Sequence, residues 1–154
     1  MITAEQRRAV HRVLDLLEAA GLRYQCTGGF AGIVHGSKWP LHDLDLDVAK
    51  ADMPTVERIL GASVTRAAAA YRDGEFDLVL LQAEVGGLEV DVSQVEGAKI
   101  LTGSGWEPMG VDLSRREFVS WEGRSVPVIP LAELIAYKRR LPGRTSDVSE
   151  LITL

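Results

Sequence analysis

With 154 residues the chain is long enough to bury a hydrophobic core, and we expect one domain over residues 1–154. Its composition, 46% hydrophobic and 25% charged, is that of a globular protein and excludes a disordered or fibrous one. The net charge of −5 argues against a broad basic surface for nucleic acid, and without a signal peptide or a membrane-length apolar run we expect a cytoplasmic protein.

Hydrophobic periodicity and turn residues divide the chain into short elements. They predict, in chain order, an amphipathic helix over 4–20, a strand over 22–27, a glycine turn into a brief helix, a strand over 43–48, a helix over 52–60, a hairpin over 76–95, a second hairpin over 117–129, and helices over 131–141 and from 145 onward. Residues 62–75 show no clear period. Because strands outnumber long helices and mostly form hairpins, the predicted class is α+β with a mixed or antiparallel sheet flanked by helices.

Polar residues at the expected helix starts are typical N-caps. Thr3 and Gln6 have the spacing of a capping box, in which each side chain accepts from the other residue's backbone N–H. Asp52 is the expected cap of the helix that follows it, and either Thr145 or Ser146 is the expected cap of the last helix.

The strand over 43–48 combines an apolar face with an acidic one. Asp43, Asp45 and Asp47 occupy every second position, so their side chains project from the same face of the strand. Carboxylates held this close repel one another unless a positive charge lies between them, and oxygen ligands suit Mg²⁺. From these three residues alone, a metal site and a solvated acidic face are equal alternatives.

Other known aspartate and nucleotide-binding motifs match this part of the sequence poorly. A calcium loop that starts at Asp43 requires glycine at its sixth position and glutamate at its twelfth, where this chain has Val48 and Pro54. The segment resembles the aspartyl-phosphatase pattern only in part, because His42 stands where an apolar strand is expected. Neither a dinucleotide-binding fingerprint nor a phosphate-binding P-loop surrounds Gly28.

Four short motifs in order resemble those of the nucleotidyltransferase superfamily, which shares its fold with the palm-like core of DNA polymerase β. They are Gly28-Gly29 after a strand, Asp43-Leu44-Asp45 on the next strand, Asp91 within LEVDVS, and a C-terminal helical segment with Lys138, Arg144 and Asp147. The pair His35-Gly36 is also similar to small bacterial members, which include antibiotic-modifying and toxin–antitoxin nucleotidyltransferases.

The resemblance implies a role for each acidic residue. Asp43 and Asp45 would hold two Mg²⁺ ions, and Asp91 would complete one metal site while it accepts the proton of an acceptor hydroxyl. Asp47 extends the row and resembles the third carboxylate of lincosamide nucleotidyltransferases. Catalytic and metal-binding roles are therefore expected for Asp43, Asp45 and Asp91.

The same resemblance implies how the nucleotide is held. Backbone N–H groups at Gly28 and Gly29 would cradle the phosphates, and Lys138 would neutralise the leaving group. Lys38 would partly replace the Arg and Thr that relatives carry in the loop before the aspartate pair. The alternatives are a plain glycine turn, a solvated Lys138, and a bracing role for the residues around Arg144. His42 is expected to face away from the aspartates.

These observations predict a nucleotidyltransferase that uses Mg²⁺ to transfer a nucleoside monophosphate from an NTP to an acceptor hydroxyl, with release of pyrophosphate. The acceptor stays open among a small molecule, a protein and tRNA. The alternative is a non-catalytic binding module of the same fold, such as a toxin–antitoxin component. Because the chain lacks an obvious substrate domain, a homodimer or a partner protein is expected to complete the pocket.

Overall fold

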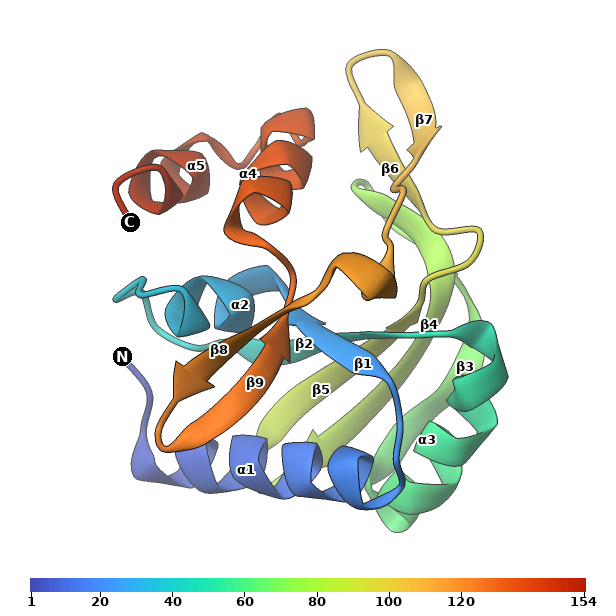
Figure 1. The fold of residues 1–154 in the computed structure, drawn as a ribbon. Helices are drawn as coiled ribbons and strands as arrows, with labels where there is room; N and C mark the ends of the chain where they lie inside the picture. Colours follow the sequence, from blue (N-terminus) through green and yellow to red (C-terminus); the bar gives the residue numbers. More distant parts are fainter.

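The computed structural model describes all 154 residues as five α-helices around one nine-stranded sheet (Figure 1). The helices are α1 (Ala4–Ala19), α2 (Gly28–Val34), α3 (Met53–Leu60), α4 (Leu131–Arg140) and α5 (Thr145–Leu151). The strands are β1 (Tyr24–Thr27), β2 (Asp43–Val48), β3 (Val64–Arg72), β4 (Phe76–Val85), β5 (Leu88–Gln94), β6 (Lys99–Thr102), β7 (Gly105–Pro108), β8 (Glu117–Trp121) and β9 (Arg124–Val128). None of the helices combines the length and the apolar character that a membrane crossing needs.

The sheet is mixed, with the strand order β7-β6-β4-β5-β2-β1-β9-β8 and with β3 paired to β4. Its centre is the pair β2 and β5, which run parallel, while β1 and β4 flank them as antiparallel neighbours. This arrangement confirms the predicted α+β class with a mixed sheet. It also brings residues from distant parts of the chain into register on adjacent strands.

The two faces of the central strands differ as their alternation predicts. Leu44, Leu46 and Val48 of β2 are fully buried, and they belong to one core cluster with apolar residues of α1 and α3. Figure 1 shows α1 and α3 below the sheet and α4 and α5 above it. The aspartates of β2 therefore project toward the side on which α2, α4 and α5 lie.

Local signals account for most of the element boundaries. The capping box of Thr3 and Gln6 forms as predicted, and Gly86-Gly87 and Glu122-Gly123 close the two predicted hairpins. The predictions for the other two caps hold less well. Asp52 occupies the N-cap position of α3 as predicted, but its side chain makes no capping bond because it ends a short 3₁₀ turn. The predicted cap of the last helix is wrong, because α5 begins at Thr145 and its N-cap is Arg144.

The short helix α2 is fixed by Trp39 in the following loop. The indole Nε1 donates to the Gly29 carbonyl oxygen at 2.8 Å, and the ring lies so close to Gly32 that an added Cβ would stand 2.1 Å from it. Because the contact involves a rigid ring, only glycine fits at position 32. Trp39 thus sets the position of the glycine turn in front of β2.

Candidate active site

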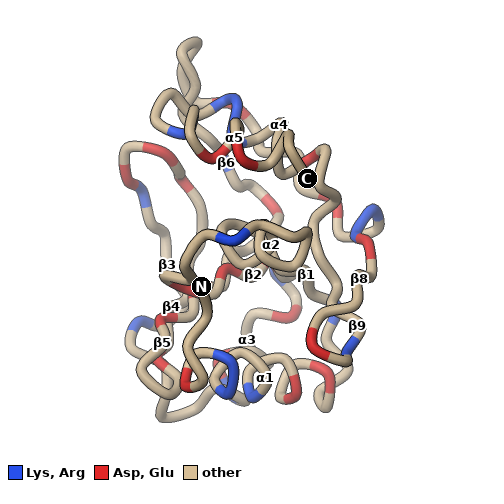
Figure 2. The backbone as a smooth tube through the Cα atoms, turned by 90° about the vertical axis from the view of Figure 1, so that its left-hand side faces the viewer, with Lys and Arg blue, Asp and Glu red and all other residues tan.

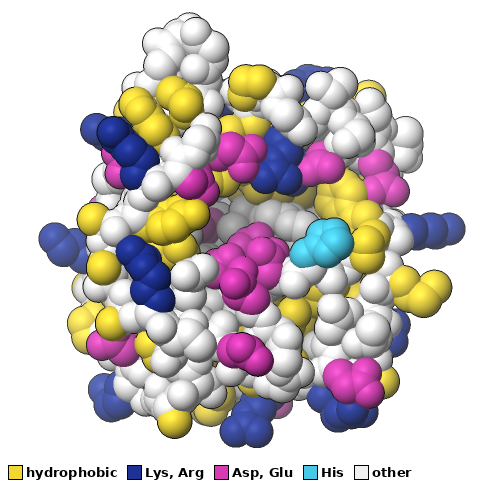
Figure 3. Space-filling model, turned by 180° about the vertical axis from the view of Figure 1, so that it is seen from behind, with side chains coloured by type: hydrophobic (Ala, Val, Ile, Leu, Met, Phe, Trp, Pro, Cys, Tyr) yellow, Lys and Arg dark blue, Asp and Glu magenta, His cyan; other side chains and the backbone are white.

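A cavity of about 590 Å³ lies over the acidic face of the sheet and is also lined by residues of α4 and α5. The volume falls within the range of small-molecule sites in proteins. Figure 3 shows the corresponding hollow, with clustered acidic side chains at its centre and hydrophobic side chains around it. The acidic residues that line the cavity are Asp43, Asp45, Asp47, Asp73, Glu75, Glu89, Asp91 and Asp147.

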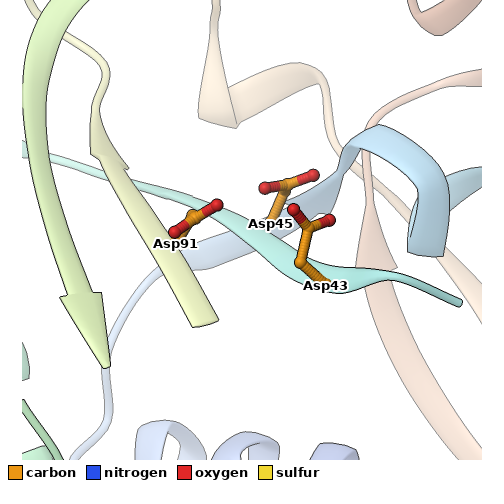
Figure 4. Close-up of side chains that lie close together, drawn as sticks. All are labelled: Asp43, Asp45 and Asp91. Carbon is orange, nitrogen blue, oxygen red and sulfur yellow. The ribbon is translucent and has the colours of Figure 1, made fainter. Parts of the chain in front are cut away.

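Three of these carboxylates meet at one point. Asp43 and Asp45 project from β2, and Asp91 projects from β5, where it stands directly opposite Asp45 in the parallel register. Figure 4 shows the three side chains pointing toward a shared space, and one carboxylate oxygen from each residue lies within 4.8 Å of those of the other two. The structure thus brings together the residues that the sequence separates by more than forty positions.

The cluster is electrostatically unfavourable when it is empty. Burial, followed by repulsion from Asp43 and Asp91, raises the pKa of Asp45 well above its ordinary value. Burial also raises the pKa of Asp91 to about 6, although a hydrogen bond from Gln82 Nε2 at 3.0 Å opposes the shift. Three oxygen donors without a basic residue between them are a donor set that fits Mg²⁺.

Gly28 lies against this cluster. Its φ of +62° is in the left-handed region, and an added Cβ would stand 2.2 Å from Asp45 Oδ2. The glycine pair is therefore more than a turn, because its first member leaves room for the Asp45 carboxylate.

Gly28→Ala is expected to destabilise the protein by about 2 kcal/mol or more, since it adds a clash with Asp45 to the strain of a positive φ. Gly21→Ala is the matched control, because Gly21 has a φ of +67° and nothing within 4 Å of the added Cβ. Urea denaturation of both variants measures the difference. Equal losses would mean that Asp45 moves aside at no cost.

Asp47 is the buried member of the acidic row. Its side chain is 7% exposed and accepts a hydrogen bond from Gln25 Nε2 at 2.9 Å across the β1–β2 pair. Burial raises the pKa of Asp47 to about 6, which the Gln25 bond partly offsets. The Gln25 Oε1 atom is buried without a hydrogen-bond partner. Asp47 therefore differs from Asp43 and Asp45 in its surroundings, although alternation places all three alike.

The basic residues of the cavity are held by carboxylates of the same protein. Lys138 is 5% exposed, and its Nζ donates to Asp147 Oδ2 at 2.8 Å. Arg144 forms a two-bond ion pair with Glu75, at 3.0 and 2.8 Å. Lys138 thus lines the cavity as a buried ion-paired residue, whereas Lys38 is exposed and lies outside the cavity lining.

Asp147→Asn is expected to cost about 2 kcal/mol of stability, because it leaves the Lys138 ammonium buried without its counter-charge. Glu5→Gln removes an exposed partner of Arg8 and is expected to change stability by less than about 0.5 kcal/mol. Chemical denaturation of the two variants in parallel compares these costs. A loss in Asp147→Asn no larger than that in Glu5→Gln would show that water reaches Lys138.

Two features of the site differ from the sequence-based expectation or lie beyond it. His42 lines the cavity rather than facing away, since β2 starts only at Asp43 and strand alternation does not extend to His42. Glu75 lies beyond the sequence-based prediction, because it is in the turn between β3 and β4 and meets Arg144 only through the fold. The only sequence signal for Glu75 is its position as an acidic residue directly before Phe76, where β4 begins.

Comparison with solved structures identifies the fold. The chain has the nucleotidyltransferase fold: it superposes on the Thermotoga maritima protein TM1012, described as a nucleotidyltransferase, with a TM-score of 0.77 and 23% identity over 99% of this chain and 94% of that one. It also superposes on ANT(2'')-Ia in complex with adenylyl-2''-tobramycin, with a TM-score of 0.60 and 17% identity over 94% and 86% of the two chains. A solution structure of ANT(2'')-Ia gives a TM-score of 0.61 and 15% identity over 94% and 80%.

The family follows from the sequence itself. Residues 9–151 match the family model of the aminoglycoside-2''-adenylyltransferases, and the chain belongs to this family. No curated protein matches the chain in sequence. Membership confirms the sequence-based assignment to the nucleotidyltransferases and identifies the protein as an enzyme of that class.

Proposed function

We propose that the protein transfers a nucleoside monophosphate from an NTP to an acceptor hydroxyl in a Mg²⁺-dependent reaction that releases pyrophosphate. The observation that carries the proposal is the meeting of Asp43, Asp45 and Asp91 within 4.8 Å on the floor of the cavity. Family membership supports nucleotide transfer in general, and the carboxylates supply the oxygen donors that the metal requires.

Each carboxylate has a distinct role in the proposed reaction. Asp43 and Asp45 would hold the metal pair, which when bound stabilises the attacking and the departing oxygen of an in-line displacement. Asp91 accepts the proton of the acceptor hydroxyl, whose oxygen forms the new bond to the α-phosphorus. The bond from this phosphorus to the bridging oxygen breaks, and its electron pair leaves with pyrophosphate.

The triphosphate is proposed to lie at the start of α2, where backbone N–H groups at Gly28 and Gly29 would donate to phosphate oxygens. The space beside Gly28 is filled by the Asp45 carboxylate, whereas a Cβ at Gly29 would meet only Trp39 Nε1 at 3.9 Å. Lys138 is proposed to neutralise the leaving pyrophosphate from α4. Because Lys138 is bonded to Asp147 in the structure, it has to exchange this carboxylate for a phosphate oxygen. Lys38 is outside the cavity lining, and the proposal gives it no role.

Among acceptors, a small molecule fits the site better than a macromolecule. The cavity has the volume of a small-molecule site, and its acidic lining repels the phosphates of tRNA. Figure 2 shows Lys and Arg scattered among Asp and Glu over many elements, without a continuous basic stripe. ANT(2'')-Ia is described with adenylyl-2''-tobramycin, which makes ATP and a cationic small molecule the first pair to test.

Calorimetry with each NTP, with and without Mg²⁺, tests the first half of the proposal. Pyrophosphate release with pooled small-molecule acceptors, tRNA and protein extract tests the second half, and mass spectrometry identifies the product. We expect Mg²⁺-dependent binding and release in the wild type and no release in Asp91→Asn. Absence of NTP binding in the presence of Mg²⁺ would contradict the proposal and favour the non-catalytic alternative.

A further inference from the structure

An apolar row leads away from the carboxylate cluster along β4. Gln82, which donates to Asp91, shares one face of β4 with Leu80, Leu78 and Phe76, because alternate residues of a strand project to the same side. These three residues line the cavity, and at the rise of a strand they extend over about 13 Å. Phe76 and Leu78 are only half-buried, so they leave apolar surface available inside the cavity.

Other elements enclose this row. Met109 and Val111, which follow β7, and Leu141, which follows α4, line the cavity as well. Arg140 of α4 links the segment after β7 to this helix, because its guanidinium donates to the carbonyl oxygens of Pro108 and Met109. The row therefore forms one wall of a half-open cleft that is continuous with the carboxylates.

The charge of the cavity is strongly negative beyond the metal cluster. Lys138 and Arg144 are its only Lys and Arg residues, and both are paired with carboxylates of the protein. Glu89 lies two residues from Asp91 on the same face of β5, opposite Asp43 in the register. Bound metal would offset Asp43, Asp45 and Asp91 but would leave Glu89 as a carboxylate able to hold a cation.

The geometry of the proposed reaction indicates which of the two substrates contacts this wall, and the inference therefore rests on the proposed function. In an in-line displacement the acceptor oxygen approaches from the side opposite to the leaving pyrophosphate. If the triphosphate lies at Gly28 and Gly29, beside β1 and β2, the acceptor enters from the side of β5 and β4. The apolar row of β4 is on that side.

We propose that the acceptor is an amphipathic amino alcohol. Its hydroxyl lies at Asp91, its ammonium group is held by the acidic lining that includes Glu89, and its apolar group lies along Leu80, Leu78 and Phe76. A polycation without an apolar portion would leave this wall unused. The subsite thus selects for a hydrocarbon or aromatic group of up to about 13 Å.

A homologous series of 2-(alkylamino)ethanols, from ethyl to octyl, tests the subsite. Calorimetric binding is measured with Mg²⁺, both without nucleotide and with a non-reactive α,β-methylene ATP. We expect the dissociation constant to fall about fourfold for each added methylene. Neutral 2-alkoxyethanols of the same length are expected to bind at least about tenfold more weakly, because they lack the ammonium group. Affinity independent of chain length, or tobramycin binding more tightly than the octyl compound, would overturn the proposal.

A matched pair of phenylalanine substitutions locates the binding. Phe76→Ser removes a wall residue, whereas Phe118→Ser removes an exposed phenylalanine from β8, outside the cavity lining. We expect Phe76→Ser to weaken the octyl compound about tenfold and Phe118→Ser to leave it unchanged. The nearly isosteric Val111→Thr provides the same comparison if Phe76→Ser does not fold, with a loss of about threefold expected.

The outcomes separate this inference from the proposed function. If Phe76→Ser weakens the binding of α,β-methylene ATP and not that of the octyl compound, the wall holds the nucleobase and the inference is wrong. If no NTP binds while the dependence on chain length and on Phe76 persists, the proposed function fails and the amphipathic subsite stands. Pyrophosphate release that rises with chain length supports both.

Discussion

Asp45→Asn is expected to reduce nucleotide transfer by at least about a thousandfold while it raises the thermal stability of the metal-free protein. The loss of transfer corresponds to about 4 kcal/mol of transition-state stabilisation, which is the scale of a metal-dependent contribution. The gain in stability has a separate cause. Burial and the neighbouring carboxylates of Asp43 and Asp91 raise the pKa of Asp45 above that of an unfolded chain, so this carboxyl group lowers the stability of the folded protein at neutral pH.

The two effects are measured on the same variant. Pyrophosphate release reports transfer, and the melting temperature in EDTA, followed by circular dichroism at pH 7.5, reports stability. Asp52→Asn is the control, because Asp52 makes no capping bond and is not part of the cavity lining. A fall in the melting temperature of Asp45→Asn would show that the empty cluster is stabilising and would contradict this account of its electrostatics.

The clustering of acidic residues on β2 is readable from sequence because its signals are local. Strand alternation alone places Asp43 and Asp45 on one face, and the turn at Gly86-Gly87 gives the β4–β5 hairpin that carries Asp91. What alternation does not contain is the parallel pairing of β2 with β5, which sets Asp45 beside Asp91. The resemblance to nucleotidyltransferases groups Asp91 with Asp43 and Asp45, but it does not predict this pairing of strands.

The rest of the cavity depends on contacts that no local pattern records. Strand β3 has an alanine-rich sequence without alternation and forms because it pairs with β4. The short β6–β7 hairpin lies in a stretch for which the sequence pattern predicts no element. The burial of Lys138 and the pairing of Arg144 with Glu75 likewise require the assembled fold. The side of the cavity opposite Gly28-Gly29 therefore forms through pairing between strands and not through the strand propensity of its residues.

Asp47→Asn is expected to stabilise the metal-free protein by about 3 kcal/mol at pH 7.5 and by little at pH 4. The pKa of buried Asp47 is raised to about 6, roughly two units above that of an unfolded chain, and each unit corresponds to about 1.4 kcal/mol. The folded wild type holds this proton more tightly than the unfolded chain does. The contribution of Asp47 to stability is therefore greatest below about pH 4, falls as the pH rises to about 6, and is level above.

The Gln25 side chain beside Asp47 gives this prediction a structural basis. Gln25 Nε2 already donates to one carboxylate oxygen, but Gln25 Oε1 has no donor. A protonated Asp47, or the amide of asparagine, supplies that donor, whereas the carboxylate cannot. Urea denaturation in EDTA at pH 4, 5, 6 and 7.5 should show a pH slope in the wild type that is reduced in Asp47→Asn. An unchanged slope would mean that Asp47 is charged in both the folded and the unfolded state. Groups other than Gln25 would then stabilise its buried charge.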